Sequence, residues 1–135
     1  MRFIVSAAAL VMVSSAALAD CSHPAMISAA PGANESTVDN DSPTATIDCY
    51  QFVANAGQQV WVDIAGAKGD AVFAIFAPGW QAVCDALDDC DVTGDQLSDD
   101  QVTSWSDKVA VAGAYLIVVD NSRSDLEYRL NVEFR

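Results

Sequence analysis

Apolar and polar residues alternate with a period of two along much of the second two-thirds of the chain, and this is the period of a β-strand. In residues 47–54 both alternating faces carry bulky side chains, such as Tyr50 and Val53. Residues 60–65 alternate again after Gly57-Gln58, a dipeptide typical of a turn. The two segments therefore predict a β-hairpin.

Three later segments also predict strands. The apolar run 71–77 is typical of a buried strand and stops at Pro78-Gly79. Residues 115–119 are the most strand-like in the chain, and residues 128–134 alternate cleanly. No segment keeps a helical period over ten residues. The pattern predicts an all-β fold, an antiparallel, jelly-roll-like β-sandwich of about six to eight strands.

The first nineteen residues have the pattern of a secretory signal peptide. Arg2 supplies the positive end, and the apolar run 3–13 is shorter than the roughly 20 residues of a membrane span. Ala17-Leu18-Ala19 is a small-x-small cleavage site. Asp20 rather than Cys follows it, which argues against a lipoprotein. We expect cleavage after Ala19 and a mature protein, not inserted in a membrane, in the periplasm or outside the cell.

The rest of the chain divides by composition. Residues 20–46 are rich in Ala, Ser, Pro, Asn and Asp without a sustained apolar period, which predicts an irregular N-terminal arm. Residues 47–135 are predicted to form one sandwich domain. Within it, residues 81–107 form a long acidic insert that contains no Lys or Arg.

Four cysteines lie beyond the predicted signal peptide. An even number in an exported protein indicates disulfides. Three pairings are possible, and near-neighbour closure favours Cys21–Cys49 and Cys84–Cys90. The rival interpretation, a structural zinc site, lacks a CxxC motif.

The chain carries 19 acidic and 6 basic residues, a formal net charge of −13. Loss of the signal peptide would remove one base and no acid, which makes the charge −14. Nucleic-acid binding needs clustered Lys and Arg, and anionic membrane surfaces also repel such a chain. A cationic protein partner, a metal ion, or solubility alone remain as explanations.

The residue types argue against catalysis. The single histidine, His23, falls in the predicted arm, whereas a Ser-His-Asp or Cys-His site needs a positioned imidazole. Acids are plentiful enough for a paired-carboxylate hydrolase, but no two are marked as facing each other. We therefore predict a protein that is not an enzyme.

Part of the acidic insert resembles a calcium-binding loop. The pattern needs oxygen ligands at positions 1, 3 and 5, Gly at 6 and an acid at 12. Positions 1, 3, 5, 6 and 12 are filled by Asp89, Asp91, Thr93, Gly94 and Asp100. Asp95 adds one more acid to the loop. Position 12 holds the short Asp and no helices flank the loop. The predicted cofactor is therefore none, with calcium as a candidate ligand, and the simpler interpretation is a solvated loop or a protein-contact loop held by Cys84–Cys90.

Most aromatic residues lie at strand positions and are expected to pack in the core: Trp61, Phe73, Phe76, Tyr115, Tyr128 and Phe134. Trp80 and Trp105 lie beside a turn and at the end of the acidic insert. They are the more exposed of the aromatic residues, and the favoured interpretation is partial burial under the acidic insert. If they are exposed, they could stack on sugar or anchor a protein interface.

Several short segments occur in an order that is also found in a known protein family: 50–54, Gly57-Gln58, 75–79, 112–115 and 127–132. In this order the chain resembles the bacterial pre-peptidase C-terminal β-sandwich, including its stand-alone relatives, the periplasmic inhibitors of goose-type lysozyme. The resemblance covers roughly the predicted sandwich domain and leaves the arm and the acidic insert unmatched. It implies an exported β-sandwich.

The inhibitor resemblance also implies a partner site. Those proteins carry a Ser-Gly-x-Tyr segment, followed by Arg residues that reach into the lysozyme cleft. Here Gly113, Tyr115 and Arg123 match, whereas Ala112 replaces the Ser and Val118 replaces an expected Arg. The polar turn after the strand adds two more candidates, so the expected partner-binding residues are Tyr115, Asn121, Ser122 and Arg123.

We therefore expect an exported, non-catalytic β-sandwich that binds a cationic protein partner, with a goose-type lysozyme as the candidate. The alternative is a calcium- or glycan-binding accessory module of the pre-peptidase type. A third possibility is a structural protein of the cell envelope.

Overall fold

The computed structural model of the protein describes residues 21–28, 33–40, 47–66, 71–84, 90–99, 102–120 and 128–135. All elements in these ranges are strands, which confirms the all-β prediction. Along the chain they are β1 (Ala25–Ile27), β2 (Glu35–Asn40), β3 (Ile47–Ala54), β4 (Gln59–Gly66), β5 (Val72–Phe76), β6 (Gln81–Cys84), β7 (Cys90–Thr93), β8 (Ser104–Lys108), β9 (Gly113–Asp120) and β10 (Tyr128–Phe134). No helix in the described ranges is long and apolar enough to cross a bilayer.

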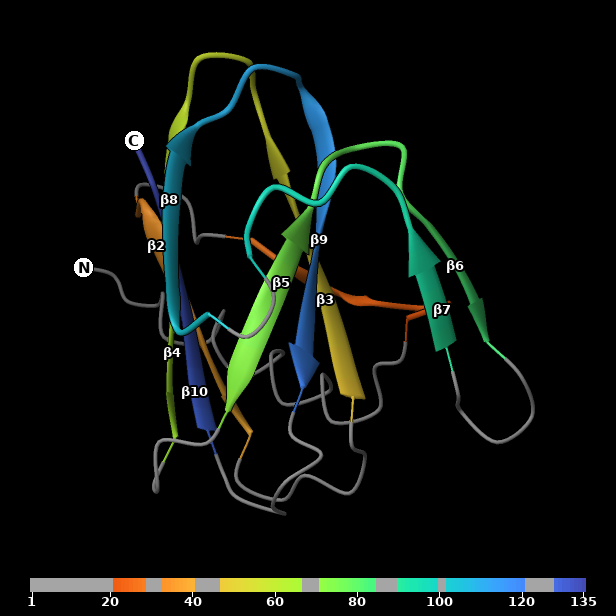
Figure 1. The fold of residues 1–135 in the computed structure, drawn as a ribbon. Coiled ribbons are helices and arrows are strands. Elements are labelled where there is room, and N and C mark those ends of the chain that lie inside the picture. The colour runs from red at the N-terminus through yellow and green to blue at the C-terminus, as the bar shows by residue number, and fades with distance from the viewer. Residues whose placement is uncertain are drawn as a thin grey trace.

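Eight strands form two four-stranded sheets that pack as a sandwich (Figure 1). The first sheet has the order β1-β3-β9-β5, and the second has the order β2-β10-β4-β8. Neighbouring strands are antiparallel, except that β1 pairs in parallel with β3. The remaining strands, β6 and β7, pair only with each other as a hairpin, visible at the right of Figure 1.

The main core fills the space between the two sheets. Large side chains from alternate positions of the central strands are shielded from solvent there, among them Tyr50, Phe52, Val60, Val62, Ile117, Leu130 and Val132. Each such side chain contributes about 1.5–3 kcal/mol of hydrophobic stabilisation. β10 shows the predicted alternation, since Tyr128 and Phe134 face the core while Arg129 is exposed.

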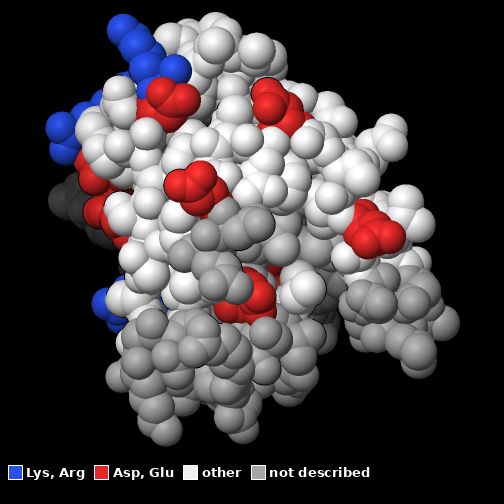
Figure 2. Space-filling model, in the orientation of Figure 1, with Lys and Arg blue, Asp and Glu red and all other residues white. Residues whose placement is uncertain are grey.

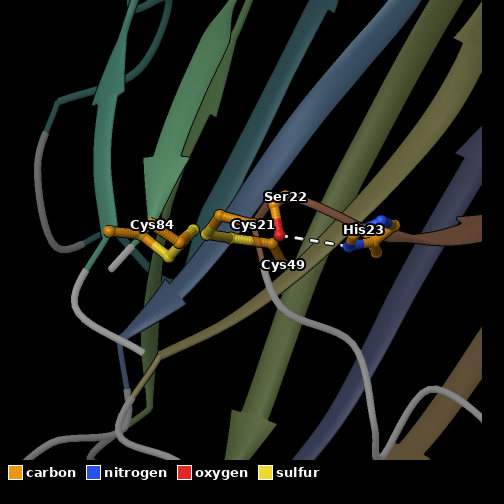
Figure 3. Close-up of a disulfide and its surroundings, with 6 residues drawn as sticks. Cys21, Ser22, His23, Cys49 and Cys84 are labelled. Atoms are coloured by element: carbon orange, nitrogen blue, oxygen red, sulfur yellow. Dashed lines mark hydrogen bonds between the residues drawn. A yellow bond between two sulfur atoms is a disulfide. The ribbon is translucent and has the colours of Figure 1, made fainter. Parts of the chain in front are cut away.

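A second, smaller core lies on the outer face of the first sheet. The β6–β7 hairpin covers this face, so that Cys49 and Leu116 are fully buried although they point away from the main core. The structure contains the two disulfides favoured from the sequence, Cys21–Cys49 and Cys84–Cys90. Figure 3 shows the two bridges next to each other, where the hairpin meets the sheet.

The outer face of the second sheet is polar. Hydrogen bonds run across its strands: the Thr37 hydroxyl donates to Asn131 Oδ1 at 2.8 Å, and Asn131 Nδ2 donates to Glu35 Oε2 at 3.0 Å. Farther along the face, Arg129 pairs with Asp39 at 2.6 Å. No layer of described residues covers this face, and exposed ion pairs of this kind contribute little stability.

The predicted hairpin between the two alternating segments 47–54 and 60–65 is wrong. β3 pairs with β1 and β9, whereas β4 pairs with β10 and β8, so the two strands lie in different sheets. Their connection, in which Gly57 has a φ of 87°, passes from one sheet to the other. Alternation shows that each segment has a buried face, but it does not identify the neighbouring strand.

The predicted irregular arm, residues 20–46, and the acidic insert, 81–107, both contribute strands. The arm supplies β1 and β2, and the insert supplies β6, β7 and β8, which raises the number above the six to eight expected. These strands are short or lie at sheet edges, where one side of the backbone lacks a strand partner. Such strands therefore form even though their sequences have only a weak apolar period.

Trp61 differs from the expectation of core packing, whereas Trp80 and Trp105 are partly buried, as the favoured interpretation had it. Trp61 points outward from β4, because Val60 and Val62 on either side face the core. Trp105 packs against the main core and Trp80 against the second core, and both are partly buried.

Candidate partner-binding site

The connection between β8 and β9, residues 109–113, presents an apolar tip at one end of the sandwich. Val111 is 56% exposed, and it lies in a loop whose two ends are held by the rest of the sandwich. The start of the connection is anchored, because Val109 is buried and exchanges backbone hydrogen bonds with the β3–β4 turn. The Gly57 N–H donates to the Val109 carbonyl at 2.7 Å, and the Val109 N–H donates to the Gln58 carbonyl at 2.9 Å. Figure 1 shows both connections arching over the upper end of the molecule.

Tyr115 holds the tip from inside the sandwich. Its ring is buried and stacks on Phe52, with ring centroids 5.2 Å apart. Its hydroxyl donates a hydrogen bond to the Val111 carbonyl. Burial raises the pKa of Tyr115, the hydrogen bond to Val111 lowers it, and the nearby Asp107 carboxylate raises it. Because the shift is upward, the hydroxyl remains a donor at neutral pH.

The far end of the tip leaves no room for a side chain at Gly113. Its φ of 146° favours glycine, and a Cβ there would lie 2.9 Å from Cβ of Pro78. The Pro78-Gly79 turn therefore packs directly against the connection. Trp80, which follows this turn, donates from Nε1 to the Ala114 carbonyl at 3.1 Å. Val111 is thus displayed on a backbone fixed on both sides.

Two basic residues that the sequence interpretation missed flank this end. Lys108 is the last residue of β8 and directly precedes the connection. Arg135 lies beside it across Gln59: the Gln59 N–H donates to the Arg135 carbonyl at 2.9 Å, and Lys108 is the register partner of Gln59. One feature of the sequence could have pointed to these two residues: basic residues are scarce, with only 6 in the chain.

The sequence matches the bacterial pre-peptidase C-terminal domain over residues 46–121, which is more than half of the chain. The chain belongs to this family. The matched range begins at β3 and ends just after β9, and it contains the whole exposed connection. Strands β1, β2 and β10 lie outside the range and complete the two sheets of the pre-peptidase C-terminal domain.

Solved structures share the fold of this pre-peptidase C-terminal domain. The periplasmic inhibitor of g-type lysozyme from Aeromonas hydrophila is 23% identical, with a TM-score of 0.58 over 83% of this chain and 96% of that one. The periplasmic inhibitors of g-type lysozyme from Escherichia coli (a mutant) and Salmonella Typhimurium are each 17% identical, with TM-scores of 0.51 and 0.52. Each of these two matches covers 83% of this chain and 97% of the other. No curated protein shows a significant match.

Of the expected partner-binding residues, only Tyr115 belongs to the described part of the chain. Its side chain is buried near the start of β9 and its hydroxyl contacts the Val111 carbonyl, so it contributes little surface of its own. Asn121, Ser122 and Arg123 lie outside the described residues.

Val118, which stands where the resemblance implies an Arg, faces the hairpin. It lines a cavity of about 340 Å³ between the first sheet and β7, together with Ala74, Phe76 and Val92. The other lining residues are mainly apolar, and Asp120 is the one acid among them.

The calcium loop receives no support from the described residues of the pre-peptidase C-terminal domain. Asp91 and Thr93 belong to β7, an extended strand paired with β6, so this backbone does not wrap around an ion. Asp95 follows the strand, and its carbonyl accepts a hydrogen bond from the Ala77 N–H. Asp89 and Asp100 lie outside the described residues. In the part of the chain that is described, no three His, Cys, Asp or Glu side chains gather around a common point.

His23 belongs to the described part of the predicted arm. It is exposed next to the Cys21–Cys49 bridge, and its Nδ1 lies 3.1 Å from Oγ of the adjacent Ser22 (Figure 3). An exposed imidazole beside its sequence neighbour lacks the enclosed cleft that nucleophilic catalysis needs.

Proposed function

We propose that the protein is an exported, non-catalytic inhibitor that inserts the connection 109–113 into the active-site cleft of a g-type lysozyme. The observation that carries this proposal is the exposed Val111 on a backbone fixed by Tyr115 and Gly113. The similar solved structures are of inhibitors of g-type lysozyme, which supports the choice of partner.

The geometry suits insertion into a concave site. A loop held in one conformation loses little conformational entropy on binding, so more of its contact energy remains as affinity. A small apolar tip fills a pocket and displaces water without leaving polar groups unpaired. The residues Ala110 and Ala112 beside Val111 are also exposed and small, so the backbone itself is able to approach the partner closely.

Charge supports the same class of partner over a longer range. The formal net charge of −13 attracts a cationic enzyme and raises the association rate, most strongly at low salt. Export to the periplasm fits the predicted signal peptide and the two disulfides. It also fits the similar solved structures, which are of periplasmic proteins.

The test is inhibition of a g-type lysozyme by the oxidised protein, with two matched exposed valines. Val111→Asp puts a charge on the tip and is expected to weaken inhibition by at least about tenfold, as for a central interface residue. Val83→Asp, on β6 where the valine is 73% exposed, is the control and should inhibit like the wild type. Inhibition by Val111→Asp equal to that of the wild type would remove this loop from the interface.

The contact expected at Arg123 is a separate proposal. Arg123 lies outside the described residues, and Asp120, the last described residue before it, is at the far end of β9 from Val111. In the same assay, Arg123→Ala separates the two proposals. A large loss of inhibition with Arg123→Ala and none with Val111→Asp would take the site away from the connection 109–113.

One observation favours the accessory-module alternative. Trp61 lies on the uncovered outer face of the second sheet, near Asp63 and Asn131, and aromatic rings beside such polar groups bind sugars. The Arg135 guanidinium lies 5.0 Å from the centre of the Trp61 ring, so a sugar would have to displace it. Quenching of tryptophan fluorescence by soluble glycan fragments, lost in Trp61→Ala, would support this alternative.

A further inference from the structure

Two of the three basic residues in the described ranges lie at the end of the sandwich that carries the apolar tip. Lys108 and Arg135 flank Gln59 there, whereas Arg129 lies at the opposite end of β10. Figure 2 shows acidic side chains scattered over the visible face and basic atoms along its left edge, most of them at the upper left beside acidic atoms, where β8 and the chain end in Figure 1. Two of the few bases of an acidic protein thus lie beside its candidate site, each with an acid next to it, Asp107 or Glu133.

The two bases differ in how far their charge is already balanced. Arg135 Nη2 lies 2.6 Å from Glu133 Oε2, and its guanidinium also covers Trp61. Lys108 is exposed, and within the described residues its ammonium group has no carboxylate partner. The adjacent Asp107 carboxylate accepts a hydrogen bond from the backbone N–H of Lys108, at 2.8 Å.

We propose that the Lys108 ammonium group pairs with a carboxylate in the cleft of the lysozyme that receives Val111, with Arg135 as a second cation behind it. Enzymes that cleave glycosidic bonds hold carboxyl groups at the cleft where the bond is broken. Charge complementarity therefore favours a base beside the inserted tip. This inference rests on the proposed function and adds the residue that recognises the cleft.

The sign of one substitution separates this contact from long-range attraction. Lys108→Gln makes the protein more negative by one charge. If the partner were recognised by overall charge alone, this variant would bind a cationic enzyme as well as the wild type or slightly faster. If Lys108 pairs with a carboxylate, the same variant dissociates faster, because a charge-assisted contact is lost.

The experiment measures association and dissociation rates on immobilised g-type lysozyme for the wild type, Lys108→Gln, Lys108→Arg and Arg129→Gln. Arg129 is the matched control, a base on the second sheet that is paired with Asp39 far from the tip. We expect Lys108→Gln to raise the dissociation constant about tenfold through faster dissociation, Lys108→Arg to retain most of the affinity, and Arg129→Gln to bind at least as tightly as the wild type.

Wild-type binding together with equal or tighter binding by Lys108→Gln would overturn the Lys108 contact and leave the proposed function standing. Failure of the wild type to bind would overturn both. Equal weakening by Lys108→Gln and Arg129→Gln would also overturn the contact, because the loss would not depend on the position of the base.

Discussion

The outer faces of the two sheets have opposite characters, although both sheets contribute to the same main core. The first sheet carries a second apolar core, covered by the β6–β7 hairpin and containing two neighbouring disulfides, one between Cys21 and β3 and one within the hairpin. The second sheet carries exposed ion pairs and side-chain hydrogen bonds. An alternating strand sequence is therefore compatible with a covered or an uncovered outer face. An outward-facing apolar residue such as Leu116 is buried only when another element covers it.

This difference assigns separate tasks to the parts of the molecule. The covered face provides stability, and the polar face provides solubility. At the end of the sandwich, residues 109–113 join the two sheets and expose an apolar side chain on a fixed backbone. The comparison can be tested by substitutions matched between these regions.

The largest expected effect is loss of the buried disulfide on the covered face. A double substitution of Cys21 and Cys49 by Ala should lower the free energy of unfolding by about 3–4 kcal/mol, because it frees a loop with a sequence separation of 28. Removing Cys84 and Cys90 should cost only about 2 kcal/mol, since their separation is 6. Urea denaturation of both variants measures the difference, and the reverse order would contradict the assignment of roles.

The next effect compares single side chains on the two outer faces. Leu116→Ala, on the covered face, should cost about 2–5 kcal/mol, as for a core position. Asn131→Ala, on the polar face, should cost about 1 kcal/mol or less, because its partners Thr37 and Glu35 are then open to water. Similar losses in denaturant titrations would show that the hairpin does not form a second core.

A smaller effect is expected at the end of the sandwich. Tyr115→Phe keeps the ring stacked on Phe52 and removes only the hydrogen bond to the Val111 carbonyl. We expect about 1 kcal/mol of lost stability together with a clear loss of inhibition at temperatures where the variant is folded. Loss of stability without any loss of inhibition would show that the conformation of the tip does not matter.

The smallest effect compares a carboxylate between the sheets with one on the polar face. Asp48 is buried and accepts a hydrogen bond from the Tyr128 hydroxyl at 2.7 Å; burial raises its pKa, and this hydrogen bond lowers it by less. Because the folded-state pKa is raised, the folded protein binds this proton more tightly. The resulting stabilisation is complete below the unfolded pKa and is lost as pH rises through the raised value.

Asp48→Asn should therefore be at least as stable as the wild type at neutral pH, with the difference shrinking toward acidic pH. Asp63→Asn, the same change at an exposed position on the polar face, is measured alongside. Melting temperatures across the acidic range measure both variants. A difference for Asp48→Asn that grows as pH falls would contradict the assigned direction.

The sequence allowed the class of fold, the buried alternation of β10 and the favoured cysteine pairs to be predicted, because each depends on local periodicity or composition. It did not allow the strand neighbours to be predicted. β3 and β4 are adjacent in sequence and lie in different sheets, and the polar edge strand β2 has almost no apolar period. Sheet membership depends on long-range pairing, which a local pattern does not encode.

The candidate site was predictable only in part. Gly113 and Tyr115 stood out through the family resemblance, but the sequence could not show that Tyr115 is buried and that Val111 is the exposed residue. Lys108 and Arg135 are 27 positions apart in the chain. They come together only through the pairing of β4 with both β8 and β10.

The most direct test of the proposed site is amide hydrogen exchange of the protein with and without a g-type lysozyme. The account predicts that binding slows exchange in residues 109–114 and in the β3–β4 turn beside them, while the hairpin residues 90–93 and the polar face of β2 keep their rates. Slowed exchange confined to β2 and β10, or to the hairpin, with residues 109–114 unchanged, would contradict it.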